Sequence, residues 1–143
     1  MQQALVLARN ALYTATPNPR VGCVIVRDGR VIGAGWTQPY GGPHAEQHAL
    51  AACGEDPAGA TAYVSLEPCN HVGASGRAES CVESLLRARI GRVVAATADP
   101  NPRMAGQSLA TLRGAGVVVD SGVGEAEARE INIGFFSRMT RGR

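Results

Sequence analysis

The amino-acid sequence predicts an α/β fold made of three layers, in which a mixed five-stranded sheet lies between helices. Segments rich in Val and Ile alternate along the chain with segments of helical periodicity, as expected for a sheet covered by helices on both faces. Asp28-Gly29 is typical of a tight hairpin turn, which makes one strand pair antiparallel and the sheet mixed. A length of 143 residues is enough for one domain with its own core, and we expect a single domain over residues 1–143.

In the first half of the chain we expect a helix, a hairpin and a second helix. Apolar residues recur at helical spacing over residues 2–13, and a proline-flanked asparagine ends that pattern. Apolar, β-branched strands are predicted over residues 21–26 and 31–36, on either side of the hairpin turn. Residues 44–53 are rich in alanine and contain no proline, which predicts the second helix.

In the second half of the chain, strands and helices alternate. Glycine-rich residues 70–76 are expected to form a loop, and a second proline-flanked asparagine, within residues 99–102, follows a strand. The expected strands are 61–66, 92–97 and 117–120, and the expected helices are 79–89, 108–113 and 125–138.

Composition and charge exclude several classes of function. The net charge is only +2 and aromatic residues make up 4% of the chain, so we do not expect a nucleic-acid partner. All 14 basic residues are arginine, which excludes a catalytic lysine. The sequence has neither a membrane span nor a signal peptide, so we expect no membrane partner and a cytoplasmic location. Cysteines stay reduced in that compartment, so metal binding or burial is expected for the four present.

His44, Cys69, Cys81 and Glu46 form a pattern typical of a hydrolytic zinc site. Zinc takes imidazole and thiolate ligands, and a catalytic zinc keeps one position for water. His44 starts one predicted helix, and the two cysteines surround the start of the next. Glu46 lies two residues after His44, close enough to move protons without being a ligand. We therefore expect Zn²⁺ as the cofactor and Glu46 as the catalytic residue.

The spacing of these residues narrows the chemistry to deamination. Zinc deaminases carry H-x-E followed by P-C-x-x-C, with the glutamate as the proton carrier. His44-Ala45-Glu46 and Pro68-Cys69 fit this signature, but Cys81 follows Cys69 after eleven residues instead of two. Deaminases of nucleosides and nucleic acids resemble the short form, so the longer spacing indicates another branch.

Longer segments of the sequence are similar to the deaminase domain of the bifunctional riboflavin-biosynthesis deaminase/reductase, in the cytidine-deaminase-like superfamily. The resemblance runs almost from end to end. It rests on residues 16–26 (TPNPRVGCVIV), 42–46 (GPHAE), 66–71 (LEPCNH), 99–102 (DPNP) and 132–138 (NIGFFSR).

The resemblance implies a reaction and a set of residue roles. The family hydrolyses the 2-amino group of 2,5-diamino-6-(5-phosphoribosylamino)pyrimidin-4-one, a phosphorylated pyrimidine, and releases ammonia. His44, Cys69 and Cys81 would hold zinc, and Glu46 would carry protons. Substrate contacts are implied for Asn18, His71, Arg77, Asp99 and Asn101, with Arg77 meeting the phosphate.

The sequence departs from the family in two respects. The segment between His71 and Cys81 is three residues longer than is usual in the family and lacks its two prolines, which leaves the placement of Arg77 open. No reductase domain follows, so we expect a stand-alone deaminase or one domain of a longer protein. A reductase domain or subunit is therefore a possible partner, and pairing into a homo-oligomer through sheet-flanking helices is expected from related deaminases.

Other readings of individual residues stay open at this point. Asn18 and Asn101 are also typical turn residues, and Arg77 is also a typical solvated loop charge. Glu67 either caps the next helix or bonds a partner of a ligand. We expect Cys23 and Cys53 to pack in the core. His48 is expected either to contact the metal ligands without binding the metal or to lie at the surface, and Trp36 is expected in the core or in an interface.

Two other functions remain as alternatives. One is a deaminase that acts on another small pyrimidine, purine or nucleoside. The other is a non-catalytic, zinc-stabilised partner domain, for which the Gly134-Phe135-Phe136 segment would offer an apolar surface.

Overall fold

A computed structural model describes residues 1–10, 21–37, 44–69, 80–98, 105–126 and 128. The predicted order of helices and strands is confirmed within these residues. The helices are α1 (Gln2–Asn10), α2 (Ala45–Ala51), α3 (Cys81–Arg87) and α4 (Gln107–Gly114). The strands are β1 (Gly22–Arg27), β2 (Arg30–Trp36), β3 (Thr61–Val64), β4 (Arg92–Ala95) and β5 (Val118–Ser121).

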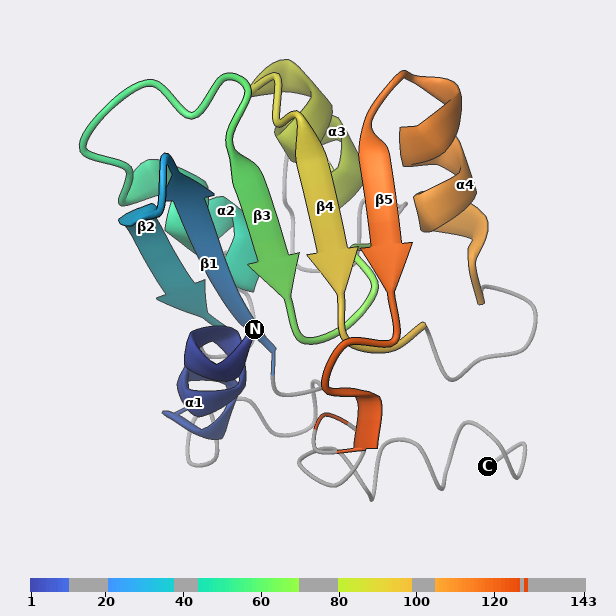
Figure 1. Ribbon diagram of the computed structural model, residues 1–143, viewed down its shortest axis with the longest axis horizontal. Coiled ribbons are helices and arrows are strands. Elements are labelled where there is room, and N and C mark those ends of the chain that lie inside the picture. Colours follow the sequence, from blue (N-terminus) through green and yellow to red (C-terminus); the bar gives the residue numbers. More distant parts are fainter. Residues whose placement is uncertain (11–20, 38–43, 70–79, 99–104, 127, 129–143) are drawn as a thin grey trace.

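The five strands form one mixed sheet in the order β2-β1-β3-β4-β5, as expected (Figure 1). β1 pairs antiparallel with both β2 and β3, whereas β3, β4 and β5 run parallel. The hairpin turn lies at Asp28-Gly29, where both residues have positive φ angles of 49° and 76°. Glycine adopts such angles at little cost and aspartate tolerates them, which explains why this dipeptide ends β1 and starts β2.

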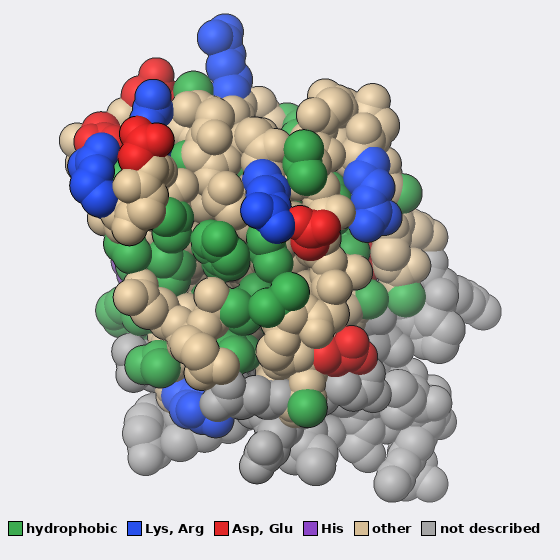
Figure 2. Space-filling model, viewed as in Figure 1, with side chains coloured by type: hydrophobic (Ala, Val, Ile, Leu, Met, Phe, Trp, Pro, Cys, Tyr) green, Lys and Arg blue, Asp and Glu red, His purple; other side chains and the backbone are tan. Residues whose placement is uncertain are grey.

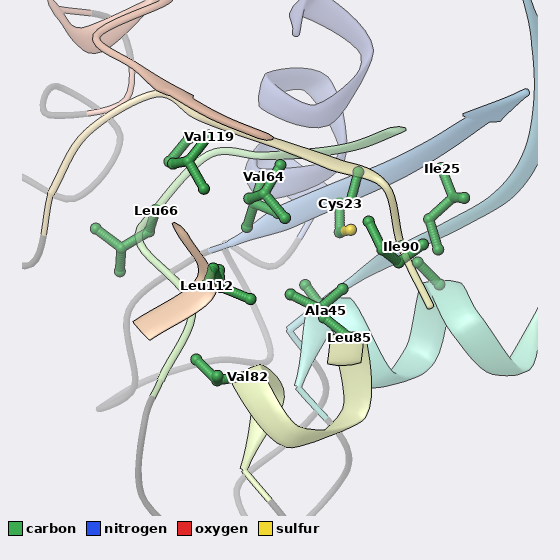
Figure 3. Close-up of a cluster of buried hydrophobic side chains, with 14 of the residues drawn as sticks. Cys23, Ile25, Ala45, Val64, Leu66, Val82, Leu85, Ile90, Leu112 and Val119 are labelled. Carbon is green, nitrogen blue, oxygen red and sulfur yellow. The ribbon is translucent and has the colours of Figure 1, made fainter. Parts of the chain in front are cut away.

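Helices cover both faces of the sheet, which gives the three predicted layers. In Figure 1, α1 lies in front of the lower ends of β1 and β2, whereas α2 and α3 lie behind the sheet. The main core fills the space between the sheet and helices α2, α3 and α4 (Figure 3). A smaller cluster on the α1 side joins Leu5, Ala96 and Ala128. The α2–α3 layer is therefore the one that can bring helix starts together at the end of the sheet.

Two glycines let helices approach the sheet at backbone distance. A Cβ atom at Gly22 in β1 would lie 1.8 Å from the carbonyl oxygen of Ala4 in α1. A Cβ atom at Gly35 in β2 would lie 2.6 Å from the amide nitrogen of Ala49 in α2. No side chain fits at either position, so the glycines set how closely α1 and α2 seat on their respective faces.

The surface seen in Figure 2 mixes charge signs. Basic and acidic side chains lie beside one another near the upper rim, while apolar side chains gather over the middle of the sheet. Arg92 pairs with Asp120, and Arg30 pairs with Glu55 at 3.1 Å. Among the described residues on this face, basic side chains thus do not form a continuous patch. No helix within the described part of the chain is long and apolar enough to cross a membrane.

The ends of several elements differ from the sequence prediction. β3 ends at Val64 instead of residue 66, and β4 ends at Ala95 instead of residue 97. Val64 is the last β3 residue paired with β1, opposite Cys23, so the strand ends where its antiparallel neighbour begins. Of the last predicted helix, 125–138, only residues 125, 126 and 128 are described, and they are helical. The predicted loop at 70–76 and residues 11–13 of the first predicted helix lie outside the described residues.

Candidate metal centre

His44, Cys69 and Cys81 come together at one end of the sheet. His44 directly precedes α2, Cys69 lies five residues after the end of β3, and Cys81 is the first residue of α3. Their donor atoms all lie within 4.8 Å of one another. Cys81 is buried, and His44 and Cys69 are half-buried, so the group is shielded by protein but still reachable.

The geometry of the three donors fits a zinc ion. Tetrahedral zinc with a nitrogen ligand at about 2.0 Å and a sulfur ligand at about 2.3 Å holds those two atoms about 3.5 Å apart. The Cys81 Sγ atom lies 3.4 Å from His44 Nδ1. One imidazole and two thiolates are a ligand set that zinc prefers, and three protein ligands leave a fourth position for a small molecule.

Hydrogen bonds fix the segments that carry the three donors. The Gln47 side chain accepts a hydrogen bond from the His44 amide at 3.3 Å and donates one to Ser84 Oγ at 3.2 Å, which ties α2 to α3. The carbonyl oxygen of Cys69 accepts a hydrogen bond from the Val82 amide at 3.1 Å. The end of the β3 segment and the starts of both helices are thus joined without the metal.

Cys69 is held in a form ready for metal binding. Its Sγ atom accepts a hydrogen bond from the Cys81 amide at 3.3 Å. Hydrogen bonding from the Cys81 side chain, and then from His44, lowers the pKa of Cys69 from 9.0 to about 3, although burial acts in the opposite direction. Since the thiolate is the form that binds zinc, this environment favours the ligand at neutral pH.

Glu46 lies in the first turn of α2 and is only 3% exposed. Burial, followed by the charge of Cys69, raises the pKa of the Glu46 carboxyl from 4.5 to about 7 in the metal-free chain. A carboxyl with a pKa near neutrality can both accept and donate a proton at the pH of the cell. Its environment therefore suits the predicted proton carrier.

The predicted substrate contacts lie outside the described residues. This applies to Asn18, His71, Arg77, Asp99 and Asn101, which therefore remain predictions.

The predictions for the remaining cysteines are confirmed. Cys23 is fully buried in the main core, and Cys53 packs against that core while its thiol donates a hydrogen bond to the Ala49 carbonyl oxygen at 3.4 Å.

His48 is not one of the three clustered donors. Its ring lies edge-on to half-buried Trp36, with centroids 5.2 Å apart, and its Nδ1 atom lies 3.3 Å from the Trp36 amide. It therefore helps to seat α2 on the end of β2.

Glu67 caps a helix, but not the next one in the chain. Its carboxylate accepts hydrogen bonds at the start of α4, including one from Gly106 N at 2.9 Å and one from Ser108 N at 3.0 Å. No local signal in the sequence links residues that are about forty positions apart, so sequence reasoning did not identify this contact.

Comparison with known proteins agrees with this site. Residues 1–97 match the family described as the cytidine and deoxycytidylate deaminase zinc-binding region. The chain is 42% identical to the diaminohydroxyphosphoribosylamino-pyrimidine deaminase of Buchnera aphidicola from Acyrthosiphon pisum, over 99% of this chain and 95% of that protein. It is 49% identical to the riboflavin biosynthesis protein RibD of Escherichia coli, over 99% of this chain and 38% of that protein.

A solved structure matches equally well. The diaminohydroxyphosphoribosylaminopyrimidine deaminase/5-amino-6-(5-phosphoribosylamino)uracil reductase of Thermotoga maritima superposes with a TM-score of 0.91 at 39% identity, over all of this chain and 41% of that one. The chain thus spans about two fifths of the longer relatives and nearly all of the shorter one. The fold and the family predicted from the sequence are confirmed: the chain belongs to the zinc-binding cytidine and deoxycytidylate deaminase family, in the branch of the diaminohydroxyphosphoribosylaminopyrimidine deaminases.

Proposed function

We propose that the chain removes the 2-amino group of 2,5-diamino-6-(5-phosphoribosylamino)pyrimidin-4-one by zinc-dependent hydrolysis, as a step of riboflavin biosynthesis. The observation that carries the proposal is the buried Glu46 carboxyl beside the His44, Cys69 and Cys81 donors. The substrate is supported by the relatives that carry this activity in their names.

The residues divide the work of the proposed reaction. His44, Cys69 and Cys81 would hold the zinc ion, which would supply a Lewis acid for the activation of water. Glu46 accepts a proton as the water adds to C2 and delivers it to the adjacent ring nitrogen. It then accepts the proton of the new C2 hydroxyl and transfers it to the departing amine, because ammonia leaves readily only when the nitrogen is protonated. The products are the aminouracil and ammonia, so atoms and charge balance.

The substrate contacts are proposed from their motifs alone. Amide and carboxylate groups at Asn18, Asp99 and Asn101 suit a polar ring edge, and His71 suits ring or ribose oxygens. Arg77 suits the phosphate, since guanidinium binds phosphate oxygens in a forked geometry.

The partners are part of the same proposal. We infer that residues 1–143 act as one domain, that the chain pairs with itself, and that a reductase domain or subunit takes up its product. The Thermotoga maritima relative, whose name joins the two activities, supports the reductase partner. Light scattering of the chain at several concentrations tests the self-pairing, which a constant mass of 14.8 kDa would contradict.

The test of the proposed reaction is ammonia release from the phosphorylated diaminopyrimidine by the zinc-loaded chain. Glu46→Gln keeps the shape of the side chain but not its proton transfer, so turnover should fall by about 10²–10⁴-fold while one zinc per chain is retained. Glu83→Gln is the matched control, because Glu83 lies exposed in the first turn of α3 and should leave turnover unchanged.

Two other results would redirect the assignment. Ammonia release from a different pyrimidine or nucleoside, but not from this substrate, would show that the chain deaminates another substrate. The longer segment before Cys81 would then be the feature that accounts for the difference. Zinc binding without turnover of any of these compounds would favour a structural zinc domain.

A further inference from the structure

Glu67 is a buried carboxylate for which the proposed chemistry has no use. It is 6% exposed and lies two residues before the zinc donor Cys69. A buried carboxylate is costly unless its oxygens are paired. Both oxygens are paired here, and among the described residues four donors at the start of α4 bond to them. They are Gly106 N at 2.9 Å, Ser108 N at 3.0 Å, Ser108 Oγ at 2.6 Å and Leu109 N at 3.4 Å.

This contact replaces a cap that α4 lacks locally. The residue at the N-cap position of α4 is Gly106, which has no side chain to accept a hydrogen bond from the helix amides. A serine or aspartate at that position would cap the helix without help from elsewhere. The chain instead caps α4 with a residue of the metal-binding segment, which links the two regions mechanically.

The backbone of Glu67 holds a second point of the chain. Its amide donates a hydrogen bond to the carbonyl oxygen of Thr97 at 2.9 Å, and Thr97 lies buried just after β4. Glu67 therefore bonds to residue 97 and to residues 106, 108 and 109, which precede and follow the connection between β4 and α4. In sequence, that connection carries Asp99 and Asn101.

The path from Glu67 to the metal donors is short and stiff. Pro68 is fully buried, and its ring restricts the backbone between Glu67 and Cys69. Cys69 is in turn fixed to α3, by the Val82 amide on its carbonyl oxygen and the Cys81 amide on its Sγ atom. A displacement of Glu67 would thus reach a zinc ligand through one intervening residue.

We propose that Glu67 is a positioning residue that fixes the zinc donor Cys69 relative to Thr97 after β4 and to residues 106–109 at the start of α4. The part of this inference that concerns substrate rests on the proposed function, because Asp99 and Asn101 are substrate contacts only in that proposal. The part that concerns the metal stands on the geometry of residues 67–69, 97 and 106–109 alone.

The experiment compares Glu67→Gln, Ser108→Ala and the double variant with the exposed-carboxylate control Glu83→Gln. Each 143-residue chain is loaded with cobalt(II), whose visible absorption reports the thiolate geometry without any substrate. KM and kcat for ammonia release are then measured on the same preparations. A residue that only stabilises α4 would lower the unfolding temperature but leave the spectrum and KM of the folded protein unchanged.

We expect Glu67→Gln to shift the cobalt bands and to raise KM about tenfold, with a smaller change in kcat, because its amide group opposes at least one backbone N–H donor. Ser108→Ala removes only the hydroxyl donor and should raise KM about twofold to threefold. In the double variant the second change should add little, since the Ser108 hydroxyl has already lost its carboxylate partner.

A wild-type cobalt spectrum together with a wild-type KM in Glu67→Gln would overturn the proposal and leave Glu67 as a cap only. If Glu67→Gln does not fold, Ser108→Ala decides in the same way, since a shifted spectrum supports the proposal and an unchanged one overturns it. If the wild type releases no ammonia, the proposed function fails, but the cobalt spectra still test the metal part separately.

Discussion

On both faces of the sheet a helix packs closely against a strand glycine, but only one of the two faces carries the metal donors. On one face α1 seats against β1 at Gly22, and on the other α2 seats against β2 at Gly35, each at backbone distance. The α1 face holds a small apolar cluster of Leu5, Ala96 and Ala128. The α2 face places His44 and Glu46 at the start of its helix, next to the cysteines. Close seating therefore stabilises the fold on one face and also positions the metal site on the other.

The largest effect is expected from removing a metal donor on the α2 face. Cys81→Ser should bind no zinc under conditions in which the wild type binds one per chain, because the fully buried Sγ atom of Cys81 is part of the donor cluster. Zinc analysis after dialysis measures this. A chelator should lower the unfolding temperature of the wild type but not that of the variant. One zinc per chain in Cys81→Ser would contradict the assignment.

The next largest effect is expected on the α1 face. Gly22→Ala places a Cβ atom 1.8 Å from the Ala4 carbonyl oxygen, so α1 must move. We expect a loss of about 3 kcal/mol or more in the free energy of unfolding. Denaturant unfolding measures the loss. The cobalt(II) spectrum of the folded variant should match the wild type, because α1 carries none of the three donors. A shifted spectrum would show that the two faces are not independent.

The matching change on the α2 face is expected to cost less stability but to disturb the site. Gly35→Ala places a Cβ atom 2.6 Å from the Ala49 amide and 2.7 Å from the Ala45 carbonyl oxygen. We expect a loss of about 1–3 kcal/mol in the free energy of unfolding. Zinc affinity should also fall, since Ala45 adjoins both His44 and Glu46. Competition with a chromophoric chelator measures that affinity, and an unchanged value would contradict the role of close seating.

The last expected effect is a pH dependence carried by Glu46 in the metal-free chain, which vanishes at low pH. Because the folded-state pKa is raised from 4.5 to about 7, the folded chain retains a proton that the unfolded chain releases within this window. The contribution of Glu46 to stability is therefore full below pH 4.5 and is lost as the pH rises through 7.

The variant Glu46→Gln has no such group. The free energy of unfolding of Glu46→Gln minus that of the wild type should increase by at most about 3 kcal/mol from pH 4.5 to pH 8. Cys69 is present in both proteins, and because its charge contributes to the raised pKa of Glu46, the difference reports Glu46 together with its interaction with Cys69. Denaturant unfolding of both metal-free proteins across this range is the measurement, and a difference that stays constant with pH would exclude a raised pKa for Glu46.

The features that the sequence could predict depend on residues close together along the chain. His44 and Glu46 are two residues apart at a helix start, so a local pattern identifies them, and Pro68-Cys69 completes the signature. The hairpin turn was equally local, since positive φ angles at Asp28-Gly29 follow from residue type.

Long-range contacts were not predictable in this way. From the sequence, Gly22 and Gly35 look like ordinary strand residues. Their role becomes visible only once the positions of α1 and α2, which contact them, are known. For Glu67 the sequence allowed either a helix cap or a hydrogen bond to a partner of a ligand. Only the fold shows that its carboxylate bonds to Ser108 in α4. The ends of β3 and β4 were overestimated because Leu66 and Ala96 extend the apolar pattern past the point at which strand pairing stops. Packing between distant segments, rather than residue type, decides each of these features.

The most direct test of the central claim is X-ray absorption spectroscopy of the zinc-loaded chain. If His44, Cys69 and Cys81 hold the metal, the first shell should contain two sulfur atoms at about 2.3 Å and two lighter atoms at about 2.0–2.1 Å, one from the imidazole and one from water. A shell with more than two sulfur atoms, or with none, would contradict the site described here and the deamination proposed for it.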